Sequence, residues 1–131
     1  MHSMPKLRFN TESPVIIITI LLEGKGNSKQ KIKVALDTGA TYTMIPWKTA
    51  VVLGLEPELS KEKIEIITAS GVEKAPLVTL DSILILGKKI EGVEVVVHDL
   101  PPKSYVDGLL GLKLLVKLKL KIDFSEGILE V

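Results

Sequence analysis

An aspartate, a threonine and a glycine, Asp37-Thr38-Gly39, follow the apolar run Val34-Ala35-Leu36 and precede several small hydroxyl-bearing residues. A carboxylate at the end of a buried strand is costly unless N–H or O–H groups surround it. A glycine two positions later allows a tight turn that exposes backbone N–H groups to the carboxylate, and the threonine hydroxyl can tie the loop to neighbouring backbone. The triplet therefore predicts a rigidly held Asp37, and makes this residue the candidate catalytic group.

One carboxylate alone is a poor catalyst of peptide-bond hydrolysis, because water must lose a proton while the carbonyl oxygen gains one. Two Asp side chains about 3 Å apart repel each other strongly enough to share one proton, and together they supply a base and an acid. The triplet is not repeated at any other aspartate of the chain, namely Asp81, Asp99, Asp107 and Asp123. A pair would therefore need Asp37 from a second copy of the chain across a two-fold axis, which predicts a homodimer.

The length and composition fit one small domain without a strong electrostatic preference. The chain has 131 residues, 17 Lys and Arg against 16 Asp and Glu, a net charge of +1 and no cysteine. This balance offers no field that would gather nucleic acid or an anionic membrane. The absence of cysteine excludes disulfides and thiolate metal sites and favours a reducing compartment, so we expect a cytoplasmic protein without a metal or other cofactor.

β-branched runs bounded by Gly, Pro and charged turns recur at short spacing, which is typical of an all-β domain. We expect strands at 14–23, 30–37, 43–46, 63–69, 72–86, 89–98, 107–110, 119–124 and 128–131. Short helices are predicted from Trp47, directly after Pro46, and at 112–118, where apolar residues have helical spacing. The predicted domain therefore spans 14–131.

Residues 1–13 are assigned to an N-terminal segment, in which Met1-His2-Ser3 precede a second methionine and are interpreted as vector-derived. The most apolar stretch, Pro14 to Leu22, is much shorter than the ~20 residues of a membrane-spanning helix and lacks the flanks of a signal peptide. We therefore expect no insertion into a membrane.

Three stretches, in this order, resemble the retropepsin-like (retroviral-type) aspartic proteases. "ALDTGATYTMIP" resembles the family's Asp-Thr-Gly-Ala box, with a hydroxyl residue, Thr43, a few places later. "ITASGVEKAPLV" (67–78) resembles the flap hairpin with Ser70-Gly71 at its tip, and "DGLLGLKLL" (107–115) resembles the second family signature before the C-terminal helix. The resemblance covers residues 14–131.

This resemblance implies a closed, mostly antiparallel barrel with a ψ-shaped loop, in which Leu109, Leu110 and Gly111 pass beside the loop of Asp37. It implies an aspartic endopeptidase in which two Asp37 carboxylates activate a water at a homodimer interface. Thr38 would form a hydrogen bond across the dimer axis, and Thr38, Gly39 and Ala40 would support the catalytic loop. The backbone of Gly39 and of Ala69, Ser70, Gly71 and Val72 would bind an extended peptide or unfolded protein.

The chain departs from the family pattern at three places. Lys113 stands where the family often has Asp or Asn, which changes the polar contacts expected near the dimer seam. The flap tip has no large aromatic residue, so Val72 and the backbone would hold the substrate. Ala40 cannot donate the hydrogen bond that a serine would give the carboxylate, so we expect a pH optimum nearer mildly acidic or neutral than strongly acidic.

Several alternatives remain at this stage. The same fold could serve as a non-catalytic dimerisation or peptide-binding module, or the enzyme could work while tethered to a membrane or partner. His98 is interpreted as a surface-loop histidine rather than a metal ligand. Lysines 113, 117, 119 and 121 are interpreted as solvent-facing residues rather than a nucleic-acid site. Tyr42 and Trp47 are interpreted as core or dimer-rim residues, with substrate contact as the less favoured alternative.

Overall fold

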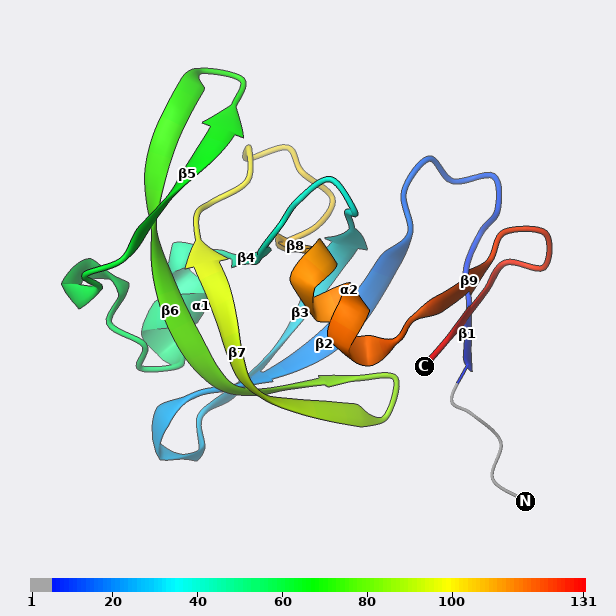
Figure 1. Cartoon of the computed structure of the whole chain (residues 1–131), viewed down its shortest axis with the longest axis horizontal. Coiled ribbons are helices and arrows are strands. Elements are labelled where there is room, and N and C mark those ends of the chain that lie inside the picture. Colours follow the sequence, from blue (N-terminus) through cyan, green and yellow to red (C-terminus); the bar gives the residue numbers. More distant parts are fainter. Residues whose placement is uncertain (1–5) are drawn as a thin grey trace.

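The computed structural model describes residues 6–131, and most of its strands form one seven-stranded sheet. The strands are β2 (Ile17–Glu23), β3 (Lys29–Leu36), β4 (Thr43–Ile45), β5 (Lys63–Thr68), β6 (Gly71–Ile85), β7 (Lys88–Val97) and β8 (Gly108–Leu110). Their order is β2-β3-β8-β4-β7-β6-β5, and an additional pairing of β2 with β6 joins the sheet to itself (Figure 1). The all-β, retropepsin-like fold predicted from the sequence is confirmed.

Two of the pairings in this sheet are parallel: β3 with β8, and β4 with β7. The others are antiparallel, and the longest ladders are those of β6 with β7 and of β2 with β3. Strand β8 lies between β3 and β4 although more than 60 residues separate it from both in the sequence. This insertion brings two chain segments that carry predicted site residues to the same place.

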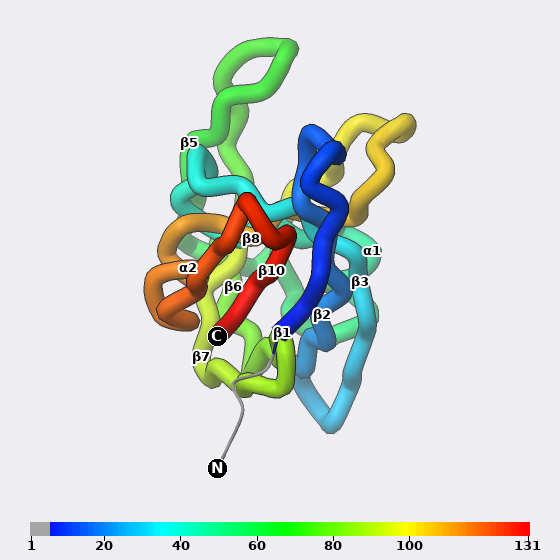
Figure 2. The backbone as a smooth tube through the Cα atoms, turned by 90° about the vertical axis from the view of Figure 1, so that its right-hand side faces the viewer, coloured from blue at the N-terminus to red at the C-terminus, as the bar shows by residue number. Residues whose placement is uncertain are grey.

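A second, three-stranded sheet joins the two ends of the described chain. It has the order β1 (Lys6–Arg8), β10 (Ile128–Glu130), β9 (Lys121–Asp123), and all pairings are antiparallel. The sequence predicted no strand at 6–8, which lies in the segment assigned to residues 1–13. The interpretation of residues 1–3 falls outside the described residues. Figure 2 shows β1 and β10 running side by side.

The two helices are α1 (Trp47–Val52) and α2 (Leu112–Leu118), as the sequence predicted. Helix α1 is followed by Gly54 with φ +66°, and α2 ends at Lys119 with φ +53°, so the predicted strand at 119–124 begins only at Lys121. Two short 3₁₀ turns, Lys25–Asn27 and Pro57–Leu59, were not predicted. No helix of the described chain has both the length and the apolar character needed to cross a membrane.

The main core fills the interior of the strand arrangement and is built from aliphatic side chains. Fully buried members include Ile20, Leu22, Ile45, Leu80 and Leu110. Helix α2 packs against this core through its buried face, which consists of Leu114, Leu115 and Leu118. Burial of such side chains stabilises the fold by about 1.5–3 kcal/mol each relative to exposure.

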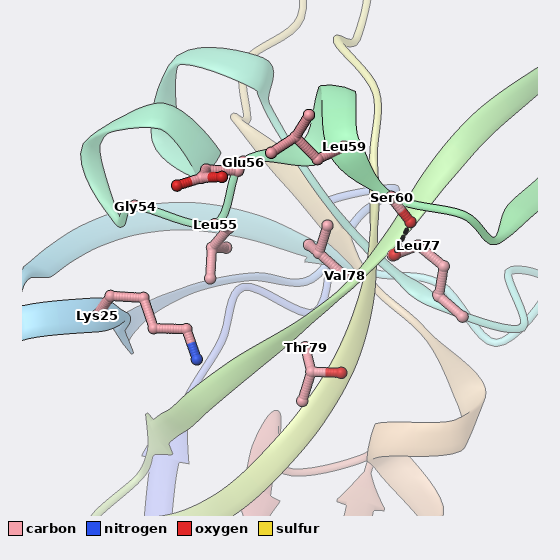
Figure 3. A pocket seen from close by; sticks show the side chains of 9 residues that line it. All are labelled: Lys25, Gly54, Leu55, Glu56, Leu59, Ser60, Leu77, Val78 and Thr79. Carbon is pink, nitrogen blue, oxygen red and sulfur yellow. Dashed lines mark hydrogen bonds between the residues drawn. The ribbon is translucent and has the colours of Figure 1, made fainter.

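A smaller apolar cluster lies at the base of the β5–β6 hairpin. Its buried members are Ala75, Leu77 and Val96, with Tyr42, Ile64 and Ile66 packed against them. The segment after α1 is attached to the same part of β6, because the hydroxyl of Ser60 donates a hydrogen bond to the carbonyl of Leu77 at 2.6 Å (Figure 3).

A pocket of about 530 Å³ lies beside this contact. It is lined by Lys25, residues 54–56, Leu59, Ser60 and residues 77–79. None of the predicted site residues lies in it.

Acid should weaken the turn between β9 and β10. Oδ1 of Asp123 accepts hydrogen bonds from the hydroxyl and N–H of Ser125 at 2.6 and 3.0 Å and from the N–H of Glu126 at 3.0 Å. These bonds, led by the Ser125 hydroxyl, lower the pKa of Asp123 below its usual 3.8. A lowered folded-state pKa stabilises the protein above the unfolded-state value, and this stabilisation disappears as the pH falls through the folded-state pKa.

We therefore expect Asp123→Ala to lower the free energy of unfolding at neutral pH and to have a smaller effect near about pH 2. Chemical unfolding of both proteins at the two pH values measures the difference. An equal loss at both values would show that the ionised carboxylate does not stabilise the turn.

Candidate active site

The Asp37 loop begins where β3 ends and is held by its own backbone. The N–H of Asp37 donates to the carbonyl of Leu110 at 3.0 Å, and the N–H of Ala40 donates to the carbonyl of Asp37 at 3.2 Å. The N–H of Gly39 donates to Oδ1 of the Asp37 carboxylate at 2.9 Å. Because charge-assisted hydrogen bonds are the stronger ones, this loop fixes the half-buried carboxylate in one orientation.

Glycine is suited to position 39 because of the space beside the carboxylate. A Cβ atom added to Gly39 would lie 3.2 Å from Oδ1 of Asp37, which is a tight contact. A side chain there would crowd the oxygen that accepts the loop's hydrogen bond. Thr38, between these two residues, is exposed, and its hydroxyl has no hydrogen-bond partner among the described residues.

Residues 109–111 pass beside the Asp37 loop, as the resemblance implied. In the parallel pair of β3 and β8, Ala35 is the register partner of Leu109 and Leu36 is that of Leu110. On the other side, Leu109 is the partner of Met44 in β4. Strand β8 therefore lies between the strand that precedes Asp37 and the strand that follows it.

Gly111 lies where the chain leaves β8 directly against the segment after the Asp37 loop. A Cβ atom at Gly111 would be 2.3 Å from the carbonyl carbon of Tyr42 and 2.7 Å from the nitrogen of Thr43. The N–H of Gly111 donates to the buried hydroxyl of Thr43 at 3.0 Å, and the N–H of Leu112 donates to the carbonyl of Ala40 at 2.7 Å. The close approach therefore depends on the absence of a side chain at Gly111.

Replacement of Thr43 by valine should destabilise the protein by about 1–3 kcal/mol, because it leaves the buried N–H of Gly111 without a partner. Thr43→Ser is the matched control, since it retains the hydroxyl and loses only a methyl group. Denaturant unfolding of both variants measures the difference. Equal stability of the valine and serine variants would contradict a structural role for this hydrogen bond.

A pocket of about 430 Å³ opens at the Asp37 carboxylate. One wall of the pocket contains Asp37, residues 39–42, Met44 and Leu109. The other wall contains residues 64–67 of β5 together with Val96. The lining side chains are therefore apolar apart from those of Asp37, Thr41, Tyr42 and Glu65. A pocket that joins an apolar wall to a fixed carboxylate is suited to an extended chain with apolar side chains.

The β5–β6 hairpin that forms this wall projects away from the body of the protein (Figures 1 and 2). Thr68 is the register partner of Gly71, so Ala69 and Ser70 form the turn, and Gly71 has φ +119°. Two apolar side chains next to the turn are exposed, Ile67 by 89% and Val72 by 65%. The predicted substrate-binding residues 69–72 therefore lie together at the hairpin end, separate from residues 109–111 at the base of the site.

The Asp37 carboxylate has no hydrogen bond to a second carboxylate within the described chain. Glu65 also lines the pocket, from β5, but it is not hydrogen-bonded to Asp37. Asp107, the acidic residue next to β8, accepts a hydrogen bond from the backbone N–H of Lys33 at 2.9 Å. Asp81 contacts Lys25, and Asp99 accepts from the N–H of Trp47, so each is engaged elsewhere.

Tyr42 combines a core contact, which the sequence favoured, with a place in the pocket. It packs against the apolar cluster at the hairpin base and also lines the Asp37 pocket. Lys113 lies over its ring, with Nζ 4.5 Å from the centroid and 3.4 Å from the hydroxyl oxygen. The lysine that departs from the family pattern is thus attached to a pocket residue by a cation–π contact.

His98 lies in a loop and is partly exposed, as the sequence analysis expected. It directly follows β7, its N–H donates to the carbonyl of Ile45 at 3.0 Å, and its side chain contacts Glu73. No group of three or more potential metal ligands occurs among residues 6–131. His98 therefore has a protein partner rather than a set of ligands around it.

Comparisons with known proteins agree with this geometry. The model of a family described as "gag-polyprotein putative aspartyl protease" matches residues 22–117. A solved retropepsin-like aspartic protease from Rickettsia conorii is 26% identical, with a TM-score of 0.68 over 98% of this chain and 94% of that one. EIAV protease, solved in complex with the inhibitor HBY-793, is 20% identical and shares the fold, with a TM-score of 0.62 over 89% of this chain and 99% of that one.

The comparison with curated proteins gave no match. The family match covers well over half of the chain, and it includes the Asp37 loop, the β5–β6 hairpin and the segment 109–111. The chain therefore belongs to the retropepsin-like aspartic protease family.

Proposed function

We propose that this protein is a homodimeric aspartic endopeptidase in which two copies of Asp37 form one catalytic site. The observation that carries the proposal is the Asp37 loop. Its carboxylate is fixed by the N–H of Gly39, opens into a pocket and has no carboxylate partner in the described part of its own chain. A fixed but solitary carboxylate in this family is best explained as half of a symmetric pair.

The chemistry follows from the shared proton of such a pair. The ionised Asp37 takes a proton from a water as the water attacks the peptide carbonyl carbon, and the protonated Asp37 of the partner donates to the carbonyl oxygen. The tetrahedral intermediate then collapses, the C–N bond breaks, and the amine leaves with a proton. No metal and no covalent intermediate is needed.

Thr38 is the residue best placed to hold two loops together. Its side chain is exposed and has no hydrogen-bond partner among the described residues, while the neighbouring Asp37 and Gly39 are bonded to each other. In a dimer its hydroxyl would bond to the loop of the partner subunit. Gly39 and Ala40 would then keep their supporting roles.

The β5–β6 hairpin would act as the flap over a bound peptide. Residues 69–72 at its end offer backbone groups for an extended substrate, and Val72 offers an exposed apolar side chain. An added strand is recognised by main-chain hydrogen bonds and by pockets for alternate side chains. The apolar pocket wall favours hydrophobic residues on either side of the cleaved bond.

The proposal is tested by incubating the protein with unfolded casein and a peptide library between about pH 4 and 8. We expect cleavage with an optimum at mildly acidic or neutral pH, because Ala40 has no hydroxyl to stabilise the ionised carboxylate. Absence of cleavage at every pH, with intact dimers by light scattering, would favour the alternative of a non-catalytic dimerisation or peptide-binding module.

Activity per chain should fall on dilution, because a monomer holds only half of the catalytic pair. Initial rates measured over a dilution series, together with the dimer fraction from analytical ultracentrifugation, give the two curves to compare. The specific activity should follow the dimer fraction. A constant specific activity in a sample that is demonstrably monomeric would exclude the shared site.

A further inference from the structure

A histidine after β7 contacts a glutamate of the β5–β6 hairpin. Nε2 of His98 lies 2.8 Å from Oε2 of Glu73, and their side chains are 26% and 48% exposed. The other ion pairs of the described chain join Lys25 to Asp81, and Lys29 and Lys89 to Glu23. The His98–Glu73 contact is therefore the one among them that links the hairpin to the body of the protein.

Both ends of this contact are fixed by neighbouring structure. The backbone N–H of His98 donates to the carbonyl of Ile45 at the end of β4, the strand that follows the Asp37 loop. Glu73 is the register partner of Ile66, a residue that lines the Asp37 pocket. Directly opposite residues of antiparallel strands lie on the same face, so Glu73 lies on the face of the hairpin that carries Ile66.

Glu73 is the acidic partner of His98, and the other charged residues of the neighbouring elements either have different contacts or lie on another face. On the hairpin, Lys74 and Glu65 are register partners of each other, and strand alternation puts them on the face opposite Glu73. Asp99, next in the chain, accepts a hydrogen bond from the N–H of Trp47 at 2.9 Å. Strand β4 contributes no charged residue, and the exposed Lys48 and Lys103, in the segments that follow β4 and β7, form no ion pair within residues 6–131.

We propose that the His98–Glu73 contact holds the β5–β6 hairpin in its substrate-binding position, and does so most firmly when His98 is protonated. An imidazolium donates a charge-assisted hydrogen bond to the Glu73 carboxylate, whereas a neutral imidazole donates a weaker one. Histidine is the side chain whose ordinary charge change falls between about pH 5 and 8. The hairpin would therefore be held under mildly acidic conditions and released more readily as the pH rises.

This inference rests on the proposed function, because the hairpin binds substrate only if the protein is the proposed peptidase. His98 and Glu73 are positioning residues, since they act through the hairpin and not on the peptide bond. The expected effects are about two- to fivefold, the size typical of an ion pair between partly exposed side chains.

The first test needs no catalytic activity. Hydrogen exchange of residues 63–76 is measured in Asp37→Asn protein at about pH 5.5 and about pH 8, with correction for the intrinsic exchange rate. Adding Glu73→Gln should speed the exchange of this segment about two- to fivefold at the lower pH and much less at the higher pH. The matched control is Glu62→Gln, at the base of the hairpin, whose side chain forms no ion pair in the described chain.

The second test uses the active enzyme. Glu73→Gln should raise KM about two- to fivefold at about pH 5.5 with little change in kcat, because the contact affects closure of the hairpin and not the chemical step. His98→Lys retains a cation at every pH, so it should keep the lower KM and remove the difference between about pH 5.5 and about pH 8.

Equal exchange of the hairpin in the Glu73→Gln and Glu62→Gln proteins at both pH values would overturn the inference, whether or not the protein cleaves peptides. Faster exchange in Glu73→Gln alone supports it even if no cleavage is ever observed. Failure of the proposed peptidase function would appear separately, as a wild-type protein that cleaves nothing while the exchange result stands.

Discussion

Asp37→Asn should abolish peptide-bond cleavage and leave the fold unchanged. Asparagine has nearly the same shape as aspartate, and its carbonyl oxygen can still accept the hydrogen bond from the N–H of Gly39 that Oδ1 of Asp37 accepts at 2.9 Å. The amide cannot take a proton from water at working pH. Loss of a general base typically costs a factor of about 10²–10⁴ in rate, and here both halves of the pair are lost together.

The control for this variant is Asp81→Asn. Asp81 is an exposed aspartate that contacts Lys25 at 3.5 Å and does not line the Asp37 pocket. It should keep wild-type kcat/KM for a cleaved peptide, while circular dichroism and light scattering should give the same fold and dimer for both variants. Retained turnover by Asp37→Asn would falsify the catalytic assignment.

Gly111→Ala should destabilise the protein by about 3 kcal/mol or more, beyond the usual range for one added methyl group in a packed core. The added Cβ atom would lie 2.3 and 2.4 Å from the carbonyl carbon and oxygen of Tyr42. These are backbone atoms between the Asp37 loop and β4, so a side-chain rotation cannot relieve the contact. The loop and residues 109–111 would have to move apart.

Gly92→Ala provides the matched control for an added methyl group. Nothing lies within 4 Å of a Cβ atom at Gly92, and its φ of +61° costs alanine about 1–2 kcal/mol. Denaturant unfolding should show a much larger loss for Gly111→Ala, or no folded protein under conditions in which Gly92→Ala is folded. Equal losses would mean that the loop and β8 can separate at little cost.

The elements with strong sequence periodicity could be predicted well. The long β6 and β7 strands are runs rich in β-branched and other apolar residues, and α2 has apolar residues at helical spacing over Leu112–Leu118. The left-handed conformation of Lys119 then fixes where α2 ends. Local patterns of this kind carry enough information to identify an element and its approximate limits.

Strand β1 could not be predicted in the same way. Its three residues, Lys6–Arg8, show no distinctive alternation, and they form a strand because they pair with Ile128–Glu130 at the other end of the chain. The 3₁₀ turn at Pro57–Leu59 follows Glu56, which has φ +49°. Such features depend on contacts between distant segments and not on a local repeat.

Part of the candidate site could be predicted because the Asp37 loop is formed by residues that are adjacent in the sequence. The Asp-Thr-Gly order predicts a turn with an N–H aimed at the carboxylate, and that hydrogen bond is present. The pocket wall could not be predicted from the sequence, because Tyr42 and Ile66 are far apart in the chain and come together only when it folds. The His98–Glu73 contact likewise joins residues that no short motif connects.

The central claim is that one catalytic site takes Asp37 from each of two chains, and mixing of subunits tests it most directly. Wild-type protein is allowed to exchange subunits with a ninefold excess of Asp37→Asn protein, at concentrations where both are dimeric. Random pairing then leaves roughly one tenth of the wild-type chains paired with each other. The same mixture made with Asp81→Asn serves as the control.

We predict that the activity per wild-type chain falls to about one tenth in the Asp37→Asn mixture, because a heterodimer has a single Asp37 carboxylate. In the Asp81→Asn mixture, activity per total chain should stay at the wild-type level. An activity per wild-type chain that is unchanged by the Asp37→Asn partner, with subunit exchange demonstrated, would contradict the shared site and show that one chain carries out the reaction alone.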